Sequence, residues 1–228
     1  MKNLTHKITL ASLASLVLAF PLSALAAEGP YLGFELGGNW TRQQHLTQNG
    51  FNFVNIDTKQ PLDSGLLWGV KGGWSFANGL RPELEYSERS NELKSFNARL
   101  FDGGGNLEGH GKENAESTFA NLWYDFQPVA ALGNLRPYFG GGIGRTRIRV
   151  RNLEAGGVPF GSSSASVNAW QLGAGVAYDI KPNWVMSLDL RHLKADTGNF
   201  GSIQNIPPGD VHAGYAANSL NLGLHYQF

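Results

Sequence analysis

The sequence has 228 residues, with 18 Lys and Arg against 18 Asp and Glu, no cysteine and 30 glycines. Balanced charge without a block of basic residues excludes a nucleic-acid-binding protein, because phosphate neutralisation needs a concentrated positive surface. The lack of cysteine excludes disulfides, thiolate metal sites and cysteine nucleophiles. The high glycine content, without a period of three, indicates tight turns and closely approaching strands rather than helices.

The N-terminal segment has the three parts of a secretory signal peptide. Two lysines lie among the first seven residues, and residues 8–20 form an apolar stretch too short to cross a bilayer as a helix. Residues 24–26 (Ala-Leu-Ala) provide a cleavage site of the small-x-small type. The sequence therefore predicts an exported protein, with a signal peptide over 1–26 and a single domain over 27–228.

The remainder of the chain contains no window that approaches the 18 continuous apolar residues of a transmembrane helix. Apolar and polar residues alternate instead with a period of two, which predicts β-strands with two different faces. Eight such segments occur, at residues 32–41, 66–76, 83–89, 120–127, 138–150, 170–179, 184–191 and 220–228.

The predicted connections between these segments differ in length in a regular way. They are long at 42–64, 90–114 and 196–216, moderate at 152–164, and short at 77–80, 128–135 and 180–183. Short periplasmic turns alternating with longer extracellular loops are typical of an outer-membrane barrel. We therefore predict an all-β fold, an eight-stranded antiparallel up-and-down transmembrane β-barrel with four extracellular loops, located in the cell outer membrane.

Aromatic residues on the apolar face gather near the ends of the predicted strands, where strands cross the two bilayer interfaces. A soluble sandwich, the other interpretation of the alternation, has no reason to form two belts. The predicted aromatic girdles consist of Trp40, Trp68, Trp74, Phe76, Tyr124, Phe126, Tyr138, Trp170, Tyr178, Trp184, Tyr226 and Phe228.

Several runs of sequence resemble the OmpA/OmpX/opacity-type outer-membrane β-barrel superfamily. They are Leu-Arg-Pro-Tyr-Phe-Gly-Gly-Gly-Ile-Gly at 135–144, Asn-Leu-Trp-Tyr-Asp-Phe at 121–126, Ala-Trp-Gln-Leu-Gly-Ala-Gly-Val-Ala-Tyr at 169–178 and Leu-Gly-Leu-His-Tyr-Gln-Phe at 222–228. The resemblance covers essentially the whole mature chain and implies a barrel domain without a peptidoglycan-binding domain. It also implies that Phe228 is the C-terminal assembly signal. It implies no particular activity, since that superfamily includes adhesins, anchors, narrow pores and a few enzymes.

The face opposite the apolar one carries six basic and six acidic residues, whose charges cancel. An eight-stranded barrel is only wide enough inside for side chains, so these charges must be paired or hydrated. The predicted lumen charge network contains Glu35, Lys71, Glu83, Glu85, Arg89, Asp125, Arg145, Arg147, Arg149, Asp189 and Arg191. We expect Arg145 and Arg147 to pair with inward acids. Two interpretations stay open, a plug of ion pairs and a thin water path.

The run Arg145, Arg147, Arg149, Arg151 places successive guanidinium groups about 7 Å apart on one face of a strand. The inward orientation given above is one interpretation. In the other, the outermost pair, Arg149 and Arg151, leaves the barrel and binds anionic sugars or lipopolysaccharide phosphates near the outer rim.

The positions of the histidines do not indicate an enzyme. Lipid A deacylases with similar barrels use a His-x-Ser pair, and none of the five histidines of the mature chain has a serine in that position. His192 comes nearest and is followed there by Lys194, so we interpret it as a polar residue at the outer interface. The histidines are also too scattered for a metal site. We predict no enzyme, no cofactor and no metal.

The sequence therefore predicts a monomeric outer-membrane barrel with a structural and surface-interaction function and a charge-paired, plugged interior. The alternative is a narrow, porin-like channel for small solutes. The expected partners are outer-membrane lipid and lipopolysaccharide, the barrel-assembly machinery through the C-terminal strand, and a host or surface ligand at the loops.

Overall fold

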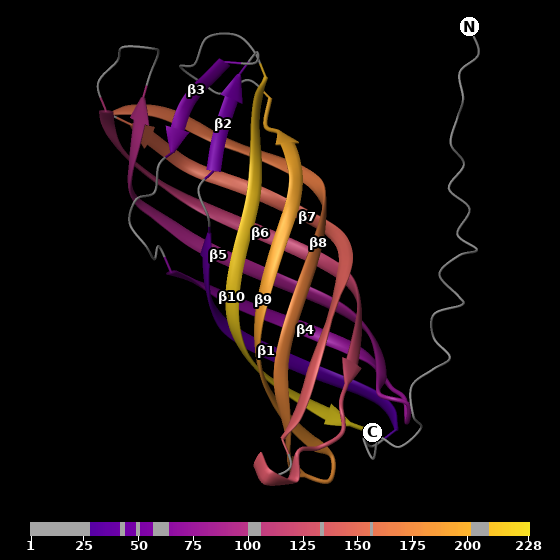
Figure 1. Cartoon of the computed structure of the whole chain (residues 1–228). Coiled ribbons are helices and arrows are strands. Elements are labelled where there is room, and N and C mark those ends of the chain that lie inside the picture. The colour runs from indigo at the N-terminus through magenta and orange to yellow at the C-terminus, as the bar shows by residue number, and fades with distance from the viewer. Residues whose placement is uncertain are drawn as a thin grey trace, which may run out of the picture.

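The computed structural model describes residues 28–41, 44–48, 51–56, 64–99, 106–132, 135–155, 157–201 and 210–228. The predicted signal peptide lies outside these residues. Eight of the strands form one closed antiparallel ring, which confirms the predicted fold class (Figure 1). The ring consists of β1 (Gly29–Thr41), β4 (Ser64–Ser75), β5 (Leu80–Arg99), β6 (Asn106–Asp125), β7 (Arg136–Ala155), β8 (Val158–Lys181), β9 (Trp184–Asn199) and β10 (Val211–Gln227).

The first and last strands of the ring close it. β1 pairs with β10 over eleven residue pairs, from Tyr31 opposite Gln227 to Thr41 opposite Ala217. Closure leaves no free edge in the ring of described strands, so the backbone groups of the ring strands can be paired without water. That condition must be met by any sheet that crosses a bilayer.

The two ends of the barrel differ, and we call them the turn end and the loop end. The turn end holds the tight connections, among them the β4–β5 turn, in which the Phe76 amide donates to the Leu80 carbonyl at 3.0 Å. Gly79 has a φ of +84° in this turn, a conformation that favours glycine. The 3₁₀ helix η2 (Ala130–Leu132), between β6 and β7, also lies at this end. The C-terminus lies there too.

At the loop end the strands continue well beyond the predicted ones. β5 runs to Arg99 and β6 starts at Asn106, inside the predicted loop 90–114, and strands likewise extend into 152–164 and 196–216. A transmembrane β-strand needs only about 9–11 residues, so these hairpins project past the bilayer.

The predicted loop 42–64 also contains strands. The hairpin of β2 (Gln44–Gln48) and β3 (Phe51–Ile56) pairs through β2 with the loop-end part of β10 (Figure 1). Each of the four predicted loops therefore contains β-structure. The alternation of apolar and polar residues is weak in these segments, so the period of two did not predict their strands.

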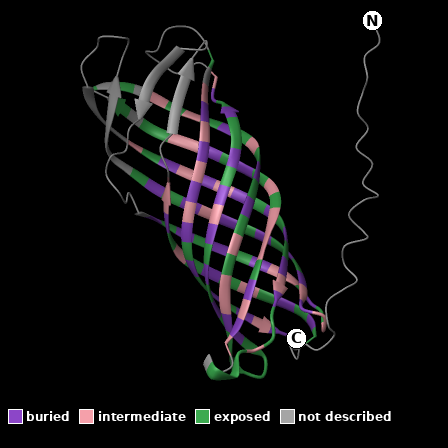
Figure 2. Cartoon of the chain, in the orientation of Figure 1, coloured by how far each residue is buried: buried purple, intermediate pink, exposed green. Residues whose placement is uncertain are grey.

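Burial alternates along each strand of the ring, so that buried and exposed residues form stripes (Figure 2). The outward face carries an apolar band, with Leu66 at 77%, Ile143 at 74% and Leu84 at 68% exposed in the absence of lipid. No helix among the described residues is long and apolar enough to cross a membrane.

The interior has two layers. The half toward the turn end is polar and charged, and we call it the charged layer. The half toward the loop end is an apolar layer in which Phe119, Leu193 and Tyr215 are at most 2% exposed. Its other buried members are Ala115, Ile148, Ala165, Ala169, Ala195, Phe200, Ala213 and Ala217. The sequence analysis predicted the charged layer but not the apolar layer.

The strand β7 has the opposite orientation to the predicted one. Phe139 and Ile143 face outward, whereas Tyr138, Thr146 and Ile148 are buried inside. The sequence suits both orientations because apolar residues occur in both sets of alternate positions.

Glycines explain why β7 takes this orientation. Gly140 and Gly144 face β6, where a Cβ on Gly140 would lie 2.8 Å from Trp123 and one on Gly144 would lie 2.8 Å from Phe119. The glycine column therefore makes room inside the barrel for two large rings of the neighbouring strand.

Candidate functional site in the barrel interior and on the outer face of β7

The charged layer is centred on Arg191 of β9, whose side chain is 1% exposed. Its guanidinium contacts three carboxylates from three strands. Nη2 lies 2.8 Å from Oε2 of Glu35, Nη1 lies 2.8 Å from Oε2 of Glu85, and Nε lies 2.7 Å from Oδ1 of Asp189. Charge-assisted contacts of this length are among the strong hydrogen bonds of proteins.

Neighbouring polar groups hold these carboxylates in place. The Lys71 ammonium lies 3.1 Å from Glu35, and the Gln171 amide donates to Glu85 at 2.8 Å. The Tyr138 hydroxyl donates to Asp189 at 2.7 Å. Each carboxylate of the group around Arg191 therefore has at least one further donor, which offsets part of the desolvation of the buried charges.

A second group surrounds Glu83, nearer the turn end. It receives hydrogen bonds from the Tyr31 hydroxyl at 2.7 Å, from Trp123 Nε1 at 2.9 Å and from the Asn121 amide at 3.0 Å. Arg81 links it to Asp125, with Nε 2.9 Å from Oδ2. Sequence reasoning missed Arg81, although its alternation with Glu83 would have placed it inside if the strand had been extended by two residues.

Arg89 is buried at the border between the two layers. Its Nη1 donates to Ser87 at 3.1 Å, and Ser87 donates to Glu85 at 3.0 Å. The Nε and Nη2 atoms of Arg89 have no hydrogen-bond partner in the described part of the chain. Most residues of the predicted lumen charge network are therefore buried inside the barrel. They are Glu35, Lys71, Glu83, Glu85, Arg89, Asp125, Asp189 and Arg191.

The predicted inward orientation of Arg145, Arg147 and Arg149 is wrong. Arg145 and Arg147 are exposed on the outer face of β7, and neither has an ion pair or a hydrogen bond from its side chain within the described residues. Arg149 pairs with Glu116 of β6 on the same outer face. The reason is the orientation of β7, in which Thr146 and Ile148 occupy the inner positions between these arginines.

The outward arginines start where the apolar band ends. Ile143 pairs with Ala120 of β6 on one side and with Trp170 of β8 on the other. Two residues closer to the loop end, Arg145 pairs in the same way with Thr118 and Asn168. Further toward the loop end, exposed Ser166 and Ser164 of β8 pair with Arg147 and Arg149. We call Arg145 and Arg147, with Thr118, Asn168 and Ser166, the β7 outer patch.

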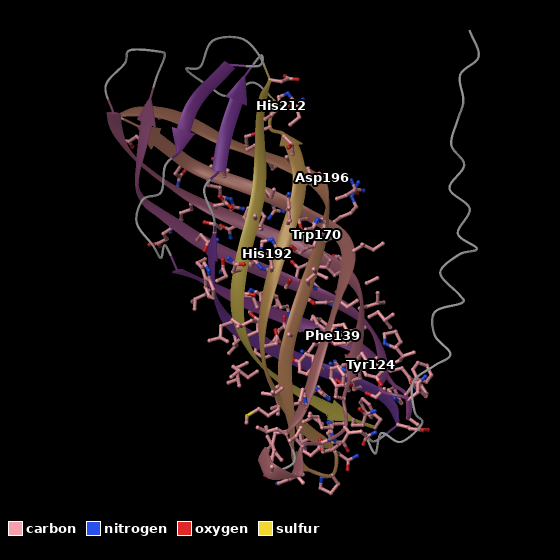
Figure 3. All side chains as sticks on the ribbon, in the orientation of Figure 1. Tyr124, Phe139, Trp170, His192, Asp196 and His212 are labelled. Carbon is pink, nitrogen blue, oxygen red and sulfur yellow. The ribbon has the colours of Figure 1, made fainter. Side chains whose placement is uncertain are left out.

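The aromatic girdle residues lie on the outer face, with one correction. Tyr138 is buried and belongs to the interior, and Phe139 takes the outward position, 5.7 Å from Phe126 between ring centroids. Tyr124 lies near Phe139 at the turn-end side of the band, and Trp170 near His192 at its loop-end side (Figure 3). The other outward members are Trp40, Trp68, Trp74, Phe76, Tyr178, Trp184, Tyr226 and Phe228.

His192 lies in the outward position that the sequence indicated. Its ring centroid is 5.6 Å from that of Trp170, and Nδ1 lies 2.8 Å from Oδ1 of Asn218. Within the described part of the chain, no group of three or more His, Cys, Asp or Glu side chains could hold a metal ion. The expected lack of enzyme activity stays a prediction.

A cavity of about 430 Å³ opens at the turn end, on the far side of the charged layer from the loops. Its wall includes Arg81, Asp125, Arg136, Ser187 and His225. Arg136 forms an ion pair with Asp179 at the rim. The sequence reading did not find this cavity, because its wall comes from several strands that are distant in sequence.

A closed antiparallel ring with an outward apolar band and a polar, buried inner half defines a transmembrane β-barrel. The sequence pattern of the family described as "Outer membrane protein beta-barrel domain" matches residues 12–228. The chain belongs to this family, which confirms the resemblance found in the sequence. A comparison with curated protein sequences finds no match.

Three solved structures illustrate the similarity of fold. OprG from Pseudomonas aeruginosa is 12% identical with a TM-score of 0.51, over 91% of this chain and 98% of that one. Neisserial surface protein A is 15% identical with a TM-score of 0.48, over 89% and 100%. The outer membrane protease OmpT from Escherichia coli is 9% identical with a TM-score of 0.48, over 91% and 99%. At these identities the similarity concerns the fold alone.

Proposed function

We propose that this chain is an outer-membrane barrel with a closed interior that acts through its outer surface. The observation that carries the proposal is the position of Arg191, which is buried and in contact with Glu35, Glu85 and Asp189. An eight-stranded ring leaves little room beyond its own side chains. A central cation bound to three carboxylates therefore acts as a plug.

The apolar layer supports the same proposal. Phe119, Leu193 and Tyr215 pack inside the loop-end half, where a hydrated path would need polar walls. In the orientation that we propose, the turn end faces the periplasm and the loop end faces the cell exterior, as in barrels with short periplasmic turns. A solute entering from either side would then meet one of the two layers.

Conductance measurements test the closed interior. The purified barrel in planar lipid bilayers should give no reproducible unitary current steps. Reproducible steps that change in size when Arg191 is replaced by a neutral residue would contradict the plug and favour the channel.

The alternative function is a narrow channel for small solutes, and two observations favour it. The cavity at the turn end brings solvent to the lower face of the charged layer. Buried polar atoms that have no partner among the described residues, such as Nε of Arg89 and both side-chain polar atoms of Asn91, continue toward the loop end. Water bound to these atoms would form part of a path, because buried waters serve otherwise unsatisfied polar groups.

We further propose that the β7 outer patch binds phosphate groups of outer-leaflet lipopolysaccharide. Arg145 and Arg147 directly follow the exposed Ile143 along the outer face of β7. In the proposed orientation this is the depth where headgroups replace acyl chains. Neither guanidinium has an ion pair within the described residues. Thr118, Asn168 and Ser166 lie beside them, and Glu116, opposite Arg147, is bound to Arg149. Arginine forks suit bidentate recognition of phosphate.

Lipid-binding measurements test the patch. The barrel in detergent would be mixed with lipopolysaccharide or with neutral phospholipid, and co-migration would be measured. The double variant Arg145→Gln and Arg147→Gln should retain less lipopolysaccharide than the parent protein, with no change for phospholipid. Lys112→Gln, which removes an exposed cation of β6 that is already paired with Glu92, is the matched control. Equal retention by the double variant would contradict the patch.

The remaining proposed partners concern the ends of the barrel. In β10, Leu220, Leu222, Leu224 and Phe228 are exposed at alternate outward positions, as an assembly signal read by the barrel-assembly machinery would require. Deletion of Phe228 should lower the amount of folded barrel in the membrane. A host or surface ligand would bind at the loops, much of which lies outside the described residues.

A further inference from the structure

We propose that the cavity at the turn end is a binding site for a small oxyanion, carrying a carboxylate or a phosphate group. Its volume of about 430 Å³ lies in the range of small-molecule sites. The wall combines polar groups from β7, β9 and β10, so the site exists only in the closed ring.

Three buried polar atoms of the wall have no hydrogen-bond partner among the residues that the structure describes. They are Nε of Arg136, Oγ of Ser187 and Nδ1 of His225, in side chains that are 8%, 5% and 6% exposed as whole residues. The Arg136 atom can only donate, and the Ser187 hydroxyl can donate as well. A buried donor without a partner is unfavourable, so a ligand with several acceptor oxygens would satisfy this wall.

The charges of the wall favour an anion. Asp125 is bound to Arg81, and Asp179 is bound to Arg136, so both carboxylates are already neutralised by a guanidinium. Lys181 adds a third cation at the rim, and it has no ion pair within the described residues. The lining residues therefore carry three cations against two carboxylates, although Arg81 also pairs with Glu83 behind the wall. This excess, next to donors without partners among the described residues, suits an oxyanion.

The wall of the cavity is continuous with the charged layer. Tyr138 and Arg81 form part of the inner wall, and both are held by the charged layer through Asp189 and Glu83. The wall is therefore fixed before any ligand arrives, which reduces the ordering that binding requires. Entry is from the turn end, and the site does not require the lumen to conduct or to be closed.

Nuclear magnetic resonance of the mature chain in lipid nanodiscs tests this site. Arginine and histidine side chains would be labelled with nitrogen-15, and inorganic phosphate and succinate would be titrated separately at constant ionic strength set by sodium chloride. The side-chain signals of Arg136 and His225 should shift in a saturable manner with at least one of the two probes. The Arg191 signal, which comes from the charged layer, should not change.

Two serine variants decide whether the wall itself binds the probe. Ser187→Ala removes this hydroxyl and should weaken binding by about tenfold, the factor expected for a hydrogen bond to a charged group. Ser219→Ala is the matched control, since Ser219 is also buried inside the barrel but does not line the cavity. It should bind the probe as the parent does.

Each outcome has a clear meaning. Saturation by phosphate alone assigns a phosphate group, and saturation by succinate alone assigns a carboxylate. Shifts that do not saturate with either probe, or equal affinity in the two serine variants, would overturn the proposal and leave a cavity that holds only water. Conductance plays no part in this test, so the result is independent of the closed-interior proposal.

Discussion

Arg191 and Glu85 come from opposite sides of the barrel and meet across its lumen, with Nη1 2.8 Å from Oε2. Arg191 lies on β9 and Glu85 on β5, and three strands separate these two in either direction around the ring. The contact therefore spans the barrel. Because the same guanidinium also binds Glu35 and Asp189, one side chain joins three strands of the wall.

The first prediction concerns this central cation. Arg191→Met should lower the free energy of unfolding by about 3–5 kcal/mol, because it leaves Glu85 and Asp189 without their cation and Glu35 with Lys71 alone. Denaturant unfolding in detergent or lipid would measure the change. Lys194→Met, an exposed position on the same strand, should change it by about 0.5 kcal/mol or less. Equal stabilities of both variants would show that water, not Arg191, balances the acids.

The second prediction tests the orientation of β7. The chain has no cysteine, so single substitutions report on one position each. Arg145→Cys should react with a membrane-impermeant maleimide in the folded barrel, because residue 145 is exposed near the headgroup level. Thr146→Cys should be protected until the barrel unfolds, because Thr146 is 0% exposed. A gel shift measures both. Protection of residue 145 and labelling of residue 146 would instead show that the arginines of β7 point inward.

The third prediction concerns the apolar band. Leu172→Arg places a charge on the lipid face and should lower the free energy of unfolding by about 2–4 kcal/mol if residue 172 lies near the bilayer midplane. Asn168→Arg, four residues closer to the loop end and level with Arg145, should have an effect of about 0–1 kcal/mol. Refolding into lipid vesicles measures both. If the two variants lowered the free energy of unfolding equally, the apolar band would not end between residues 172 and 168.

The fourth prediction compares two glycines. A Cβ at Gly144 would lie 2.0 Å from the Thr118 carbonyl oxygen and 2.8 Å from Phe119, whereas at Gly38 nothing lies within 4 Å. Gly144→Ala should therefore destabilise the barrel by about 1–3 kcal/mol through overpacking. Gly38→Ala should be close to neutral. Thermal unfolding in detergent would separate them, and a neutral Gly144→Ala would show that β6 can move away.

Local patterns explain why so much of the wall could be predicted. Side chains of a strand alternate between two faces, so Leu32, Phe34 and Leu36 against Glu35 already indicate a lipid face and an inner face. The inward positions of Glu35, Asp189 and Arg191 follow from that period alone. The same rule fails in β7, where Phe139 and Ile143 support one orientation, and Tyr138 and Ile148 support the other.

The sequence by itself determined the number of strands in the ring, their order and the family, because a period of two and the lengths of turns are local properties. Only the tertiary structure decided which charges meet. Glu85 and Arg191 are 106 residues apart in the chain, and closure of the ring brings them together. Closure likewise turned Arg145 outward, since Trp123 and Phe119 of β6 can be accommodated inside only against the glycines of β7. Such contacts depend on strand pairing, which no single segment of sequence contains.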